Sequence, residues 1–341
     1  MLSHWPQSPT PDALARDLSA GIVFAFLHVL SGRAPWLARG DKRRARAAII
    51  AAGELAEAVT NDHFDEDGLV SVFAAADPEM ALRNEELLVE VASCGDFGVV
   101  RSRQAARIAF SIGPMGEEAV VAEDLGAERP GSFLGPRYRA VLERFAELVE
   151  HTDRFSRYWQ DEDDALAEGL GDLESGRVVV EELPEVDLAV ARRVKGRPLH
   201  PRGAGAGDPV AVNEVALHSA TTASRVLVFD EGRCELRLRY EGWVRYVSRR
   251  VPLRPDLAPL AAELSALEPT GRAWAAGGVG SLVTRMRPVP EVTGLDPEVI
   301  KNAVVGYLKT APGVWDPFRH GGALVPLGER RPLSRIARAG S

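Results

Sequence analysis

The sequence predicts a protein of the α/β class, with a helix-rich N-terminal α/β domain and a smaller C-terminal mixed α+β domain. Three observations lead to this prediction. Apolar residues recur at helical spacing through much of the first half of the chain, an alternation with a period of two begins near Gly176, and 341 residues suit two domains of ordinary size. We therefore expect domains at residues 1–175 and 176–290, then a C-terminal helix and tail at residues 291–341.

The composition is that of a folded protein without a disulfide framework. Hydrophobic residues make up 45% and charged residues 26% of the chain, and the net charge of −8 disfavours duplex nucleic acid as the main partner but allows a small anionic substrate. Cys94 and Cys234 lack CxxC spacing, and the apolar run from Leu18 to Leu30 is too short for a membrane span and lacks the flanks of a signal peptide. We expect a reducing, cytoplasmic location and no membrane, while the oligomeric state stays open.

The N-terminal elements follow from caps and periodicity. Ser8, Thr10 or Asp12 could cap a helix from Pro11 to about Leu30, and Asp41 to Ala58 continues with helical composition. The chain then changes character. A short strand end at residues 57–61 leads into the polar run DHFDED, and a helix at residues 68–76 stops at an Asp-Pro pair.

Further helices are expected at Glu79 to Ser93, Ser102 to Ile112 and Pro136 to Gly169, with His151 and Asp153 where the last of these can break. The second half predicts strands instead, because its apolar residues alternate. These strands span residues 177–182, 187–194, 225–230 and 234–248, and a glycine-broken strand covers residues 274–288. A Gly- and Pro-rich loop at residues 197–209 and helices at residues 256–267 and 297–308 complete the second half.

The stretch from Thr60 to Phe73 carries the chemistry. Side chains two residues apart share one face of an extended backbone, so His63, Asp65 and Asp67 are expected to converge on one point. One imidazole with two carboxylates suits manganese, magnesium, iron or zinc more than calcium. Gly68 allows a tight turn into the following helix. The alternative interpretation is a solvated acidic loop with a helix cap.

One segment cannot complete a catalytic site. Asp96 is the first additional candidate metal ligand, because Gly95 and Gly98 bracket it as if the backbone had to approach something closely; a plain helix C-terminus is the alternative. His4, before a proline turn, is a candidate catalytic side chain, and its alternative is a partly buried ring. His218 is a candidate for substrate contact. For His151 and Asp153 a surface position is favoured.

The segment VTNDHFDEDGLVSVFA resembles the first motif of the DHH phosphoesterases, in which a strand ends in a His-x-Asp-x-Asp-Gly pattern and a serine, here Ser71, follows in the helix. The resemblance implies a DHH-like core, a two-manganese site and hydrolysis of phosphodiester or pyrophosphate bonds in a cleft between two domains. The order of EGWVRYVSRR, DLAPLAAELSAL and AAGGVGS resembles that family's substrate-binding domain. It implies that Gly277 and Gly278 present backbone N–H groups to an anion and that Arg249 or Arg250 adds charge. The alternative is an edge strand with surface arginines.

The Asp-His-His triplet of that family is absent from the chain. Over nearly its whole length the sequence is more similar to an uncharacterised bacterial family that shares the SHWPxSPTP opening, NDHFDEDG and the YExWV element at Tyr240 to Val244. This likeness also suggests that residues precede Met1 at the native start.

Three functions remain open from the sequence. The leading one is a metal-dependent hydrolase of a small anionic or phosphorylated substrate, in which Asp62, Asp65 or Asp67 takes a proton from a metal-bound water. The second is a degenerate relative that binds a metal or nucleotide in a regulatory role. The third is a metal hydrolase of amides or esters. Serine-hydrolase, P-loop and zincin motifs are absent from the sequence.

Overall fold

The computed structural model describes residues 10, 14, 16, 18–34, 47, 49–51, 53, 59, 61, 63–122, 134–194, 213–230, 232–239, 254–269, 271–278, 283–290 and 292–315. The chain divides into two compact units, with the change between Asp164 and Ala165. We expected the domain boundary near Ser175. The division between the two units instead lies inside helix α8 (Ser156–Glu174). Each unit is described by itself.

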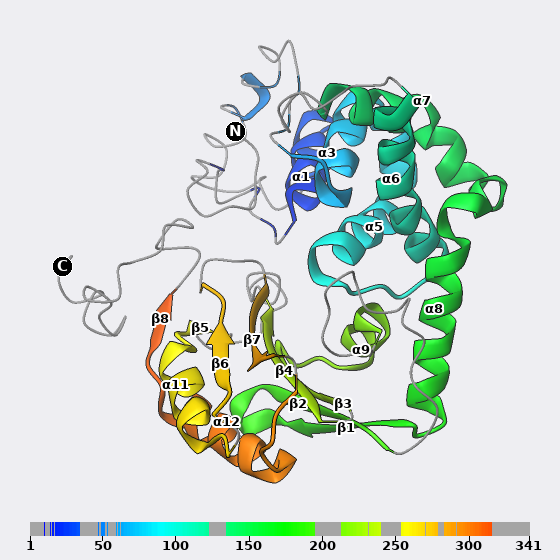
Figure 1. Cartoon of the computed structure of the whole chain (residues 1–341). Coiled ribbons are helices and arrows are strands. Elements are labelled where there is room, and N and C mark those ends of the chain that lie inside the picture. The colour runs from blue at the N-terminus through cyan, green and yellow to red at the C-terminus, as the bar shows by residue number, and fades with distance from the viewer. Residues whose placement is uncertain are drawn as a thin grey trace. The chain divides into compact units, whose positions relative to one another are not determined.

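The described part of the first unit is built from helices (Figure 1). Helix α1 packs on α3, α3 on α5, α5 on α6, and α6 on α7. Phe73 of α3 meets Phe145 of α7 edge to face, with ring centroids 4.8 Å apart. The bounds of these helices are α1 (Ser19–Leu30), α3 (Glu66–Ala76), α4 (Pro78–Arg83), α5 (Glu85–Phe97), α6 (Arg103–Ala122) and α7 (Leu134–Glu150).

Local sequence signals explain where these helices begin and end. Asp77 caps α4, because its side chain accepts a hydrogen bond from the backbone N–H of Met80, and Pro78 follows in the first turn. Gly98 ends α5 in the left-handed conformation, with φ of 62°. The helix expected from Pro136 to Gly169 is broken, since α7 ends at Glu150 and the 3-10 turn η3 (Thr152–Phe155) precedes α8.

The described residues of the first unit contain no strand, so the α/β character expected for the N-terminal domain is not found there. Residues 59, 61 and 63–65 have no strand conformation, and α3 begins at Glu66. The strand end predicted before His63 is therefore wrong for the described positions. The helix begins at Glu66, before Gly68 where we expected it, because Asp65 serves as its N-cap.

The second unit holds a mixed six-stranded sheet, which gives the chain its α/β class. The strand order is β1-β2-β3-β4-β7-β6. The β2 and β3 pair is parallel, with Val190 opposite Leu227, and every other neighbouring pair in this sheet is antiparallel. The bounds are β1 (Val178–Leu183), β2 (Leu188–Arg193), β3 (Arg225–Asp230), β4 (Arg233–Arg239), β6 (Ala273–Ala276) and β7 (Val283–Val289); η4 (Pro184–Val186) joins β1 to β2, and β5 (Arg254–Pro255) pairs with β8 (Gly313–Trp315).

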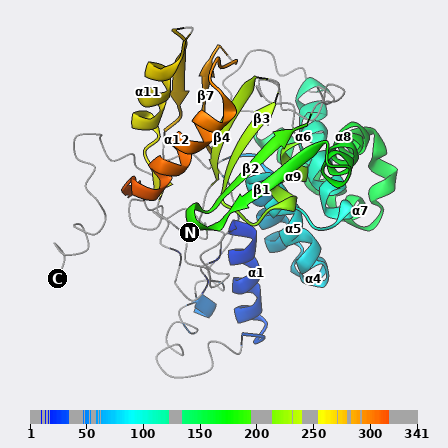
Figure 2. The ribbon, with the colours of Figure 1, turned by 90° about the horizontal axis from the view of Figure 1, so that it is seen from below.

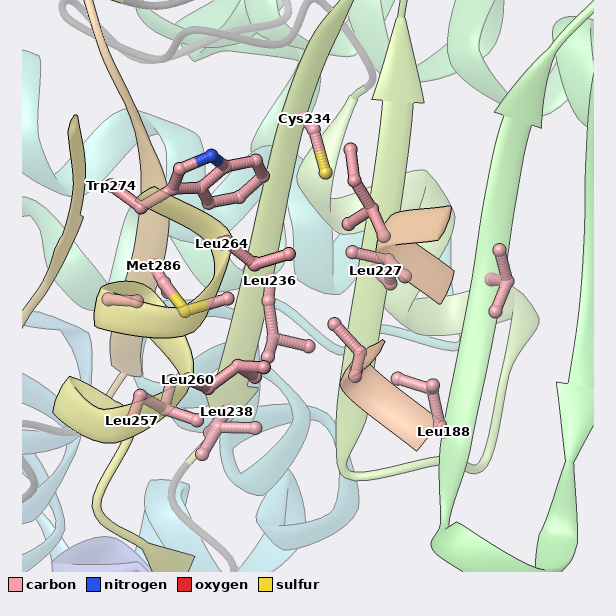
Figure 3. Close-up of a cluster of buried hydrophobic side chains, with 14 of the residues drawn as sticks. Leu188, Leu227, Cys234, Leu236, Leu238, Leu257, Leu260, Leu264, Trp274 and Met286 are labelled. Carbon is pink, nitrogen blue, oxygen red and sulfur yellow. The ribbon is translucent and has the colours of Figure 1, made fainter. Parts of the chain in front are cut away.

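Helices cover both faces of this sheet (Figure 2). On one face, alternate apolar residues of β2, β3 and β4 pack against α11 (Ala258–Leu267) and α12 (Pro297–Thr310). Figure 3 shows this core, where Leu236 and Leu227 of the sheet lie among Leu260, Leu264 and Trp274. The other face packs a smaller cluster around Leu217 of α9 (Glu214–Ala220), which lies between β2 and β3 in the chain.

We expected a C-terminal helix and tail as a separate region. The helix, α12, instead belongs to the second unit, because its residues Ile300 and Val304 are buried in that unit's core. Among the described residues, no helix is both long and apolar enough to cross a membrane. The loop expected at residues 197–209 and the element Tyr240 to Val244 lie outside the described residues.

Candidate functional site

The segment before α3 is held in place from several sides. Asp65 is the N-cap of α3, and its Oδ1 accepts a hydrogen bond of 2.7 Å from the Gly68 backbone N–H. Its Oδ2 lies 2.7 Å from Nε2 of His63, whose side chain is 48% exposed. The Tyr138 hydroxyl of α7 donates to the His63 carbonyl and accepts from the Asn61 amide. His63 and Asp65 thus form a contact pair at the rim of the first unit's helices.

Asp67 is buried and ties α3 to another helix. Its two carboxylate oxygens accept hydrogen bonds of 2.8 Å each from the backbone N–H groups of Ser19 and Ala20, at the start of α1. A carboxylate is favoured there because the first N–H groups of a helix have no partner inside the helix and carry partial positive charge. Asp67 lies in the first turn of α3, so it does not share an extended face with His63 and Asp65. The expectation that His63, Asp65 and Asp67 lie on one face of an extended backbone is therefore wrong.

The end of α5 packs against the start of α3 and brings Asp96 into the influence of the same acidic group. Burial raises the pKa of Asp96 well above its ordinary value, and the charges of Asp67, Asp65 and Glu66 raise it further. Burial also raises the pKa of Glu66 to about 7; a backbone hydrogen bond opposes this increase and the charge of Asp65 adds to it. We call Asp65, Glu66, Asp67 and Asp96 the carboxylate cluster; Asp67 and Asp96 are buried, and the side chain of Asp65 is partly exposed.

Glu66 is the member that the sequence interpretation missed. It approaches α5 so closely that a Cβ at Gly95 would lie 2.3 Å from its Oε2. The sequence indicates a close approach at Gly95 but does not identify Glu66 as the partner. Cys94 is the residue before Gly95. Burial raises the pKa of its thiol to about 12, and the charges of Glu66 and Glu90 add to that increase.

Ser71, the serine of the resembling motif, lies one turn after Asp67 and on the same side of α3. Its side chain is 9% exposed, and within the described residues its hydroxyl has no hydrogen-bond partner. A buried hydroxyl without a partner is unfavourable unless water or a ligand completes it.

The carboxylate cluster offers oxygen donors of the kind that hard divalent cations prefer. In the part of the chain that is described, however, no three His, Cys, Asp or Glu side chains form a group that could hold a metal ion as they stand. Both Asp67 oxygens already accept backbone hydrogen bonds, and Asp65 accepts from His63 and Gly68. A carboxylate oxygen has more than one acceptor position, so an oxygen that already accepts one hydrogen bond can also be a metal ligand.

The candidates in the second unit lie around α9 and β7. His218 is buried in α9, and its Nδ1 lies 3.9 Å from Glu214, one turn earlier. Gly277 uses its N–H to bond the Arg285 carbonyl, and the Gly278 carbonyl accepts from Thr284. The Gly277 N–H is therefore occupied within the sheet and does not point to an anion as the resemblance implied. Arg249, Arg250, His4 and Asp62 lie outside the described residues.

An ionic network beside His218 was not expected from the sequence. Arg237 and Glu235 of β4 are fully buried and bonded to each other. Arg285 of β7 bonds Glu235 at 2.9 Å and Glu214 at 3.1 Å. Alternation along β4 places both charged residues on the face opposite the apolar core, a signal that was present in the sequence as RCELRLR.

Comparison with known proteins decides the family. A family of unknown function, DUF6687, matches residues 1–319. The chain belongs to this family. No curated protein and no solved structure matches it. The expectation of an uncharacterised family that covers nearly the whole chain is confirmed, and membership of DUF6687 carries no activity with it.

Proposed function

We propose that the protein is a divalent-cation-dependent hydrolase of a small anionic substrate, with its centre at the carboxylate cluster. The supporting observation is the meeting of α3 and α5, which places Asp96 within reach of the charges of Asp65, Glu66 and Asp67 although the two segments are far apart in the sequence. Partly or wholly buried like charges are unfavourable unless protons or a cation compensate them. Clusters of this kind are frequent at functional sites.

Asp65, Asp67 and Asp96 would hold the cation, with His63 as a further donor. Manganese or magnesium suits this set, and iron or zinc is compatible with it through the imidazole. A bound cation would supply a Lewis acid that makes a water nucleophilic near neutral pH.

The protein's own side chains have separate tasks in this proposal. Asp65 fixes the ring of His63 through the contact at Nε2, which orients the imidazole as a donor to the cation. Asp67 holds the start of α1 against α3, so the cluster keeps its shape. Ser71 offers a buried hydroxyl with no partner among the described residues.

The substrate class rests on the resemblance of the segment around His63 to the first DHH phosphoesterase motif. It favours a phosphodiester or pyrophosphate bond. The second candidate is a DUF6687 protein that binds a metal or nucleotide without turnover, and the absence of the Asp-His-His triplet from the sequence favours it.

A turnover screen separates the two candidates. Purified protein would be incubated with phosphodiesters, nucleotides and pyrophosphate compounds, with manganese added or with chelator. The hydrolase proposal expects turnover that requires manganese and is lost in Asp96→Asn but kept in Glu86→Gln, a control at an exposed acid of the same helix. Metal-independent turnover, or equal turnover in both variants, would contradict it. Stoichiometric metal without any turnover would favour the binding protein.

A further inference from the structure

A second place in the first unit has the features of a ligand site and is separate from the residues used above. A hollow of about 430 Å³ lies between α6 and η3. Its volume falls within the range of small-molecule pockets. Six polar side chains that line it carry the argument, namely Gln104, Arg107, Glu150, His151, Asp153 and Arg154.

Arg107 is a fixed cation at this hollow. Its guanidinium lies over the Trp159 ring, 4.3 Å from the ring centre, and its NH2 group donates to Asp163 at 3.0 Å. Asp163 is only 3% exposed, so this anchor is held firmly. A guanidinium whose position is already fixed loses little entropy when it binds an anion.

The third contact of Arg107 is weak by comparison. Its NH1 group lies 3.4 Å from Asp153, whose side chain is 89% exposed. Such an exposed and long ion pair contributes little to stability. A ligand carboxylate can therefore take this position without breaking the anchor to Asp163.

The lining balances its charges. Arg107 and Arg154 are cationic, and Glu150 and Asp153 are acidic. Arg154 is itself largely exposed and pairs with Glu147 at 3.1 Å. A simple anion would meet the two carboxylates as well as the two guanidinium groups, whereas a ligand with both charges would satisfy both sets.

We propose that this hollow binds a small zwitterion of the amino-acid type, such as a free amino acid or a dipeptide. The ligand carboxylate bonds Arg107 and Arg154, and the ligand ammonium group bonds Glu150 and Asp153. The 3-10 turn η3 presents Asp153 and Arg154, while Glu150 ends α7 just before it and Arg107 comes from α6. This proposal does not depend on the hydrolase function of the carboxylate cluster.

The test uses defined probes on the full chain. The twenty standard amino acids and alanyl-alanine would be screened one at a time by ligand-observed NMR, and binders measured by calorimetry. We expect at least one probe to bind one to one with a Kd below about 1 mM. Its N-acetyl derivative lacks the ammonium charge and its C-terminal amide lacks the carboxylate, so each should bind about tenfold more weakly.

Matched variants locate the site. Arg154→Gln and Glu150→Gln should each weaken binding about fivefold, because each removes one exposed charge partner. Arg157→Gln and Glu143→Gln change exposed charges that do not line the hollow and should leave binding unchanged. Thermal melting checks that all four variants fold.

Three results would overturn the proposal: no probe binding up to about 10 mM, equal binding of the parent compound and either derivative, or equal effects of the lining variants and their controls.

Discussion

At the residue scale, Asp67 shows how one side chain can join two helices. Its carboxylate accepts hydrogen bonds from the first backbone N–H groups of α1, while its own backbone belongs to α3. It is 2% exposed, so water cannot replace these bonds if the carboxylate is altered. The acidity of the DHFDED segment therefore has a structural cause at this position, in addition to the role that we propose for it in cation binding.

Asp67→Asn tests this structural role. An amide keeps the shape but turns one acceptor into a donor that faces a backbone N–H, so we expect a loss of about 2 kcal/mol in the free energy of unfolding. Urea titration of chelator-treated protein measures it. Glu79→Gln, a change at a highly exposed acid of α4, should cost less than about 0.5 kcal/mol. A loss for Asp67→Asn as small as that of the control would contradict the account.

Asp163 makes the stability of the first unit depend on pH. Burial raises its pKa, but hydrogen bonds and charges from Arg103 and Arg107 outweigh this, so the pKa is below the ordinary value. A carboxyl with a lowered pKa in the folded state stabilises the protein above its unfolded pKa of about 3.9 and loses that contribution as the pH falls through the folded pKa.

We therefore expect Asp163→Asn to lower the free energy of unfolding by about 2 kcal/mol at pH 7. The difference from the wild type should shrink as the pH falls below about 4. Urea titrations at several pH values measure both. A difference that stays constant or grows toward low pH would show that the arginines do not stabilise the ionised form.

At the element scale, the meeting of α3 and α5 is decided by a missing side chain. Gly95 lies within helix α5, where glycine is normally unfavourable, and the space that its Cβ would fill is taken by Glu66. The glycine is therefore explained by a contact between elements and not by helix formation.

Gly95→Ala should destabilise the protein by about 1 to 3 kcal/mol, because Glu66 has to move from a packed position. Gly171→Ala is the matched control, since Gly171 lies in helix α8, no proline follows it, and a Cβ there meets nothing within 4 Å. That control should gain about 0.5 to 1 kcal/mol from helix propensity alone. Thermal and urea unfolding of both variants measure this, and a gain in Gly95→Ala would refute the proposed contact.

Periodicity placed most helices and strands, because each pattern reports which face of an element is buried. It failed before α3, where the i, i+2 spacing of His63 and Asp65 looked like a strand and is in fact the approach to a helix cap. It could not reveal the contact of Glu66 with Gly95, the bonds of Asp67 to α1 or the burial of Arg237, since each depends on packing between segments far apart in the sequence.

At the scale of the whole molecule, the two units have different kinds of interior. The described interior of the first unit packs helices around apolar side chains and the carboxylate cluster, while the second unit contains an apolar core on one sheet face and an ionic network on the other. Removal of one partner from a buried ion pair leaves a charge without compensation.

Arg237→Met should thus destabilise the second unit by about 3 kcal/mol and leave the carboxylate cluster unaffected. Hydrogen exchange followed by mass spectrometry should show faster exchange in peptides from β1 to β7, with unchanged exchange in α3 and α5. The double variant Glu235→Gln with Arg237→Met should recover part of the loss, because it also removes the charge left behind. Equal acceleration in both units would show that they do not unfold separately.

In the proposed function, Asp96 and the start of α3 form one cation site. Titration of chelator-treated protein with Mn²⁺, in which electron paramagnetic resonance counts the free ion, measures binding at this site. We expect one bound ion per chain in the wild type and in Glu86→Gln, and a loss of at least about tenfold in affinity in Asp96→Asn. No bound ion in the wild type, or equal affinity in Asp96→Asn, would contradict it.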